Sequence, residues 1–158
     1  MIKFSDIISV KKAEPKARDP APGVIKGRFK IQKSDDDKML AFGWAYVSKD
    51  IDGNQAEDYS GDITEIEEIE KAAYQFVQYY RDGSDNHERG GVANLIESIV
   101  FTKEKQTSLG IPEGTVPEGW FVGFQITDPD VWEKVKSGEY MDFSIEGEAI
   151  REEITETE

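Results

Sequence analysis

The sequence predicts an α+β domain in which helices flank a mostly antiparallel β-sheet. Runs of β-branched and aromatic residues at 39–47, 92–102 and 120–126 have the composition of strands. Between the first two runs, residues 63–81 carry apolar side chains at helical spacing. A chain of 158 residues, 37% of them hydrophobic, is long enough to bury the core of one domain.

Charge is distributed unevenly along the chain. Residues 1–33 hold nine of the 19 Lys and Arg and three of the 33 Asp and Glu, which leaves ten basic against thirty acidic residues, a charge of −20, in the remainder. Such an acidic body repels nucleic acid and anionic membranes, so neither is expected as a partner. We expect residues 1–27, which contain three prolines, to form a flexible basic arm. Residues 28–151 then form the domain and residues 152–158 an acidic tail.

The sequence contains no cysteine, which excludes a disulfide framework and a thiolate metal site. It has no apolar run of 18 residues that could span a bilayer. Residues 1–10 are too polar for a signal peptide, so nothing argues for export and a cytoplasmic location is expected.

The first ordered elements are predicted to form a hairpin. Alternating residues at 29–31 indicate one strand, residues 34–37 (SDDD) indicate a turn, and residues 39–47 have the composition of a buried strand.

The segment after this hairpin resembles a calcium loop only in part. Asp50, Asp52 and Asn54 occupy positions 1, 3 and 5 of an EF-hand loop. Position 6 is Gln55 where that loop needs glycine, and position 12 is Gly61 where it needs a bidentate glutamate. The pattern therefore predicts a loop between elements and disfavours a calcium-binding module.

Asp62 is a candidate N-cap, and Glu65 three residues later would complete a capping box. The apolar positions that follow recur at helical spacing: Ile66, Ile69, Ala73, Phe76, Val77 and Tyr80. We predict an amphipathic helix over residues 63–81, with its apolar stripe against the core.

In the second half of the chain, residues 103–109 are expected to form a helical turn and residues 110–119 a loop. Asp128 and Pro129 should begin a short helix that Gly138 ends. Residues 140–150 predict a last strand, on which Ser144, Glu146 and Glu148 share one face.

His87, the only histidine, lies in a polar, glycine-rich stretch at 84–91 that predicts a loop. Its ordinary pKa of about 6.5 suits proton transfer near neutral pH, although a lone loop histidine is more often a surface residue. Glu97 stands among the apolar residues of the run at 92–102. Its carboxylate either faces solvent or orients a neighbouring imidazole.

A series of short segments follows one another in a specific order and spacing between residues 39 and 151. They are AFGWA at 41–45, GDI at 61–63, EKAAY at 70–74, HER at 87–89, LIES at 95–98, VFT at 100–102, GWFVGF at 119–124 and FSI at 143–145. In this series the chain resembles the XkdF-like phage serine proteases, relatives of the prohead maturation proteases of tailed phages.

The resemblance implies a small barrel-like β-sheet with flanking helices, similar to herpesvirus assemblins. It implies a serine endopeptidase that cleaves phage scaffold and major capsid proteins inside the immature head, in the cytoplasm of the bacterial host. No cofactor or metal is implied, and the oligomeric state, a homo-oligomer included, stays open. Carried over by position, His87 is the general base and Ser144 the nucleophile.

A His-Ser-His triad is excluded because the chain has one histidine. The third member is then a carboxylate, a backbone carbonyl or water, with Glu97 as the first choice and Glu148 as the second. The alternative function is a non-catalytic phage head assembly protein on the same fold.

Overall fold

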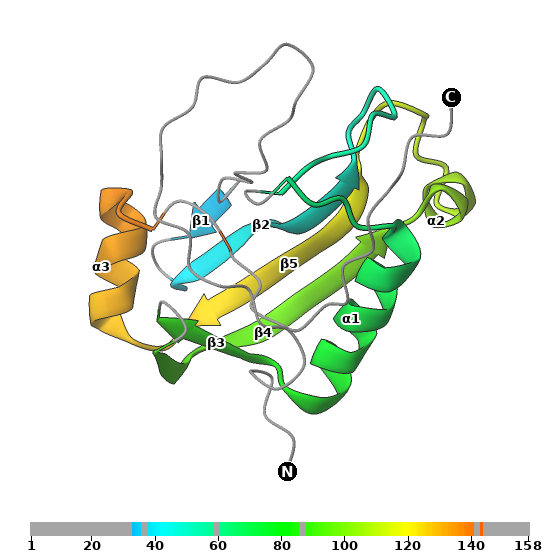
Figure 1. Cartoon of the computed structure of the whole chain (residues 1–158). Coiled ribbons are helices and arrows are strands. Elements are labelled where there is room, and N and C mark those ends of the chain that lie inside the picture. The colour runs from blue at the N-terminus through cyan, green and yellow to red at the C-terminus, as the bar shows by residue number, and fades with distance from the viewer. Residues whose placement is uncertain (1–32, 36–37, 59–60, 86–87, 141–142, 144–158) are drawn as a thin grey trace.

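The structure is a computed structural model that describes residues 33–35, 38–58, 61–85, 88–140 and 143 (Figure 1). Within these ranges the chain forms five strands and three helices. The strands are β1 (Lys33–Asp35), β2 (Leu40–Lys49), β3 (Asp82–Asp85), β4 (Arg89–Phe101) and β5 (Glu118–Ile126). The helices are α1 (Ile66–Tyr79), α2 (Lys103–Ser108) and α3 (Pro129–Ser137).

The five strands form one sheet in the order β1-β2-β5-β4-β3, and every neighbouring pair is antiparallel. The predicted α+β class, with helices beside an antiparallel sheet, is therefore confirmed. The described sheet is open, with β1 and β3 at its edges. Closure of the sheet into a barrel of the prohead protease or assemblin type stays a prediction.

The core lies between α1 and one face of the sheet. Successive side chains of a strand point to opposite faces, and Trp120, Val122, Phe124 and Ile126 of β5 are all buried on one of them. The ring of Phe76 on α1 packs edge-on against Trp120 and Phe124, at centroid distances of 5.5 and 6.5 Å. This packing fixes α1 across the central strands.

The opposite face of the sheet carries half-buried aromatic side chains. Trp44 contacts Phe101 and Phe121, at ring centroid distances of 5.7 and 5.3 Å. Gly123 also belongs to this face, because a Cβ placed on it would lie 2.7 Å from the ring of Phe42 and 3.1 Å from the Cβ of Glu97. Glycine is therefore the only residue that fits between these two side chains without a shift.

Helix α1 is confirmed, but it begins later than predicted and the capping box is absent. Its N-cap is Glu65, with no side-chain cap, and not Asp62. The backbone N–H of Asp58 donates to the carbonyl of Asp62 at 2.9 Å, and Ile63 forms a β-bridge with Glu57. These contacts keep residues 62–63 extended, which prevents them from joining the helix.

The predicted loop at 84–91 is largely wrong, because β3 and β4 form a hairpin there. Residues 82–85 (DGSD) contain no strong β-former, yet they pair with β4 from Asp82↔Asn94 to Asp85↔Arg89. Strand β4 begins three residues before the predicted run at 92–102. Tertiary pairing has overridden local propensity in this hairpin.

The first predicted hairpin is confirmed in part. Strand β1 occupies Lys33–Asp35 and pairs antiparallel with β2, so Ser34 and Asp35 belong to a strand and not to the turn. The strand expected at residues 29–31 lies outside the described residues.

The other elements of the second half agree closely with the sequence. Helix α2 lies within residues 103–109, and α3 begins after Asp128 and ends at Gly138, as predicted. Tyr140 lies in a bend and does not begin a strand. Residues 144–150, the arm at 1–27 and the tail at 152–158 lie outside the described residues. Among the helices described, none is long and apolar enough to cross a membrane.

Gly119 is expected to tolerate no larger side chain. A Cβ there would lie 2.4 Å from the carbonyl oxygen of Tyr46 and 2.9 Å from the Cα of Val47, both of which are backbone atoms. Gly119→Ala should therefore lower the free energy of unfolding by about 1 to 3 kcal/mol, and the melting temperature by roughly 4 °C per kcal/mol. The control is Gly90→Ala, where a Cβ meets nothing within 4 Å. Equal melting temperatures for the two variants would contradict the packing described.

Candidate functional site

Of the four predicted catalytic residues, only Glu97 lies within the described residues. His87, Ser144 and Glu148 lie outside the described residues. Described residues lie on both sides of His87 and before Ser144: Asp85 ends β3, Arg89 begins β4, and Phe143 packs against the core. Tyr140, four residues before Ser144 in the sequence, is hydrogen-bonded to Asp85, two residues before His87.

Glu97 is exposed on β4, opposite Gly123, on the face of the sheet that α1 does not cover. It is eight residues beyond Arg89, or roughly 25 Å at about 3.3 Å per strand residue. The structure therefore places Glu97 far along β4 from Arg89, which follows His87 by two residues in the sequence.

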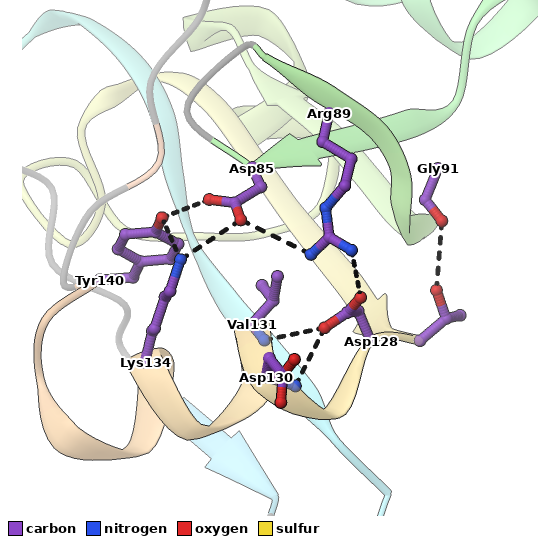
Figure 2. A network of polar contacts seen from close by, with 9 residues as sticks. Asp85, Arg89, Gly91, Asp128, Asp130, Val131, Lys134 and Tyr140 are labelled. Atoms are coloured by element: carbon purple, nitrogen blue, oxygen red, sulfur yellow. Dashed lines mark hydrogen bonds and ion pairs between the residues drawn. The ribbon is translucent and has the colours of Figure 1, made fainter.

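A network of charged and polar side chains lies at the end of the β3–β4 hairpin (Figure 2). We call it the hairpin cluster, and it consists of Asp85, Arg89, Asp128, Lys134 and Tyr140. Its members come from β3, from β4, from the N-cap and body of α3, and from the segment after α3. The cluster thus joins parts of the chain that are up to 55 residues apart.

Asp85 is the centre of the cluster, and its side chain is only 15% exposed. Its Oδ1 accepts a hydrogen bond from the hydroxyl of Tyr140, and its Oδ2 accepts one from Nζ of Lys134 at 3.3 Å. Lys134 Nζ also donates to the Tyr140 hydroxyl at 3.1 Å and lies 5.0 Å from the centroid of that ring. Three side chains are therefore mutually bonded.

Arg89 connects this triangle to the start of α3. One of its terminal nitrogens donates to Oδ2 of Asp128 at 2.7 Å, and the other lies 3.6 Å from Oδ2 of Asp85. Asp128 is also the N-cap of α3, because its Oδ1 accepts from the backbone N–H groups of Asp130 and Val131. These contacts hold the end of the β3–β4 hairpin against the N-terminal end of α3.

Local signals place Tyr140 within reach of Asp85. Gly138 ends α3 in the left-handed conformation, at φ 77°, which is a glycine-compatible helix C-cap. The chain then turns back, and the N–H of Tyr140 donates to the carbonyl of Lys134 at 3.0 Å. Three residues later, Phe143 packs on Phe124 with ring centroids 5.5 Å apart.

The contacts in the cluster favour an ionised Asp85, a charged Lys134 and a neutral Tyr140 hydroxyl. The hydrogen bond from Tyr140 lowers the pKa of the Asp85 carboxyl, and Lys134 and Arg89 lower it further. The same bond raises the pKa of the Tyr140 hydroxyl. Hydrogen bonds to Tyr140 and Asp85 raise the pKa of Lys134. At neutral pH every group therefore holds the protonation state that its contacts require.

Chemically, the cluster is suited to holding segments in place. Asp85 is ionised and already accepts hydrogen bonds on both oxygens, so it is poorly placed to act as a proton acceptor. Among the described residues, no three His, Cys, Asp or Glu side chains gather into a group that could hold a metal ion. Sequence reasoning missed the cluster because no local pattern relates Asp85 to Tyr140.

The chain belongs to a phage protein family described as "Putative phage serine protease XkdF", whose family model matches residues 28–153. Its predicted family resemblance is therefore confirmed. The matched range includes the whole described sheet and both His87 and Ser144.

Two proteins of Bacillus subtilis (strain 168) are similar to this chain. The phage-like element PBSX protein XkdF is 28% identical over 135 residues, which are 85% of this chain and 46% of that protein. The uncharacterized protein YqbD is 29% identical over 120 residues, which are 75% of this chain and 34% of that protein. The chain thus spans less than half the length of either relative. No solved structure matches it.

The lowered pKa of Asp85 predicts a pH dependence for the cluster's contribution to stability. Because this pKa is lower in the folded state, the contribution is fully present above the ordinary value of about 3.9 and is lost as pH falls through the lowered value. Urea unfolding midpoints of the wild type and Asp85→Asn should differ by a constant amount from about pH 5 to 8 and begin to converge as pH falls below about 4. A difference that persists unchanged at low pH would show that the variant lost only packing.

Proposed function

We propose that this chain is the peptidase domain of a phage serine endopeptidase that cleaves scaffold and major capsid proteins during head assembly. Membership of the XkdF family over residues 28–153 carries the proposal, since that range contains both a candidate base and a candidate nucleophile. The substrates and the head-maturation role go beyond the family description and belong to the proposal. The location within the assembling head and the activity of any longer protein also belong to the proposal.

In the proposed reaction, His87 accepts the proton of Ser144 Oγ while that oxygen bonds to the carbonyl carbon of the scissile peptide. The imidazolium formed then donates the proton to the leaving amine, which departs as the acyl-enzyme forms. Water, deprotonated by the same imidazole, hydrolyses the ester and restores Ser144. Backbone N–H groups would stabilise the oxyanion in both steps.

The hairpin cluster supports this assignment without placing either residue. Asp85 and Arg89 each lie two residues from His87, and Tyr140 lies four residues before Ser144. Their mutual contacts join the strand that precedes the proposed base to the segment that precedes the proposed nucleophile. A protease on this fold needs these two segments to be near each other, because its catalytic residues are 57 positions apart.

The third member of the site stays open among the sequence-based candidates. Glu97 is still a proposal, and its position eight residues along β4 from Arg89 weighs against it. Glu148, a backbone carbonyl or a water molecule could orient the imidazole instead. The protease needs no metal or cofactor in this mechanism.

Ser144→Ala should abolish processing while the protein folds normally, because the change removes only the nucleophilic oxygen. We expect cleavage of phage head proteins during assembly to fall by roughly 10⁴-fold or more, as for other triad deletions. Ser108→Ala is the matched control, since Ser108 is exposed on α2 and bonds only within its own helix turn among the described contacts. Complete processing with Ser144→Ala as the sole copy would exclude serine catalysis and favour the non-catalytic assembly protein.

A further inference from the structure

We propose that Asp85, Lys134 and Tyr140 form a clamp that sets the position of the hairpin end relative to the segment after α3, and that they act as positioning residues in peptide cleavage. The inference rests on the proposed function for its catalytic part. Its structural part depends only on described residues. None of the three would touch the substrate.

The clamp closes a long loop of chain. Residues 85 and 140 are 55 positions apart, and the Asp85 side chain that accepts the hydrogen bond from Tyr140 is only 15% exposed. Lys134 is hydrogen-bonded to both Asp85 and Tyr140, so removing any one of the three side chains takes one hydrogen bond from each of the other two. Charge-assisted hydrogen bonds of this kind are about twice as strong as neutral ones.

The hairpin end is held by a short strand pairing and by polar contacts. The β3–β4 pairing shifts register between Gly83 and Ser84, so the residues beyond that bulge form a short, separate ladder. Of these residues, Ser84, Arg89 and Gly90 are exposed. The sequence of this tip, SDNHERG at residues 84–90, contains no apolar side chain, so polar contacts must hold its orientation.

The segment after α3 is fixed at two points. Tyr140 is bonded to Asp85, and Phe143 packs on Phe124 of the central strand β5. One point is polar and faces the hairpin, while the other is apolar and belongs to the core cluster. Loss of the Tyr140 hydroxyl would leave the segment attached to the core through Phe143 and would loosen its link to the hairpin.

Contacts outside the clamp attach α3 to the hairpin independently of Tyr140. Arg89 and Asp128 already join the hairpin to the start of α3, and Asp128 caps that helix. The global attachment of α3 therefore does not depend on Tyr140. Removing the Tyr140 hydroxyl should change the alignment of two segments while the domain remains folded.

The test uses Tyr140→Phe in the full chain, which removes the hydroxyl and retains the ring beside Lys134. Tyr79→Phe is the matched control, since Tyr79 is 71% exposed on α1. We expect kcat for cleavage of a phage head protein to fall about tenfold or more, with KM changed less than about threefold, because misalignment affects the reacting atoms. The control should retain wild-type kcat.

Amide hydrogen exchange gives a readout that does not depend on catalysis. The N–H of Glu88 donates to the carbonyl of Asp85 at 3.0 Å across the hairpin turn. Exchange of this amide should be several-fold faster in Tyr140→Phe than in the wild type and unchanged in Tyr79→Phe. Lys134→Met should have the same effect, and Lys134→Arg, which keeps the charge, should restore slower exchange.

The two readouts separate failure of the clamp from failure of the proposed function. If the wild type cleaves no head protein, the proposed function fails, and faster exchange in Tyr140→Phe still supports the clamp. Unchanged exchange at Glu88 overturns the clamp whatever the activity. Faster exchange with wild-type kcat overturns the positioning role, because the contact would then be purely structural.

Discussion

Antiparallel pairing between β4 and β5 places the first residues of β4 beside the residues that follow β5. Ala93 pairs with Ile126, so Arg89, four residues earlier on β4, comes within reach of Asp128, two residues after that partner. Strand β3 pairs on the other side of β4 and brings Asp85 to the same end. The register between β4 and β5 therefore decides which side chains meet in the hairpin cluster. Helix α3 begins shortly after β5, whose side chains form much of the core (Figure 1).

The cluster's value to the protein differs from that of an ordinary group of surface charges. Exposed ion pairs contribute little to stability, and Arg89 is half exposed. Asp85 is mostly buried and is shared by three partners, so its contacts restrain one another's geometry. Apolar packing of Phe76 and Phe143 on Phe124 supplies cohesion, while the polar contacts select the alignment of segments on that core. The proposed protease site, whose base and nucleophile are 57 positions apart in the sequence, requires such alignment more than additional stability.

The sequence predicted those elements whose signals are local. Asp128, Pro129 and Gly138 define both ends of α3 by their own conformational preferences. Strand β3 escaped prediction because Asp82 to Asp85 have no β-propensity and become a strand only by pairing with β4. The N-terminus of α1 was misplaced because a bridge between Glu57 and Ile63 competes with the helix.

For the candidate site, the sequence could predict only individual residues whose side chains are suited to catalysis. His87 and Ser144 were identified from residue type and family resemblance, whereas the contact between Asp85 and Tyr140 depends on the fold and leaves no pattern in the sequence. Glu97 was predicted to be catalytic because it is a lone acid in an apolar run. The structure explains this carboxylate differently, since the register shifts between Leu95 and Glu97 and the Glu97 side chain is exposed.

The most direct test of the central claim is an experimental structure of the full chain after reaction with a phosphonate inhibitor of serine proteases. The account predicts a covalent bond from phosphorus to Ser144 Oγ, with a ring nitrogen of His87 about 2.6 to 3.2 Å from that oxygen or from the adduct. Tyr140 should still be bonded to Asp85 in that structure. An adduct on another serine, or a His87 ring that lies more than about 10 Å from Ser144 in the inhibited protein, would contradict the assignment of a serine protease site to this fold.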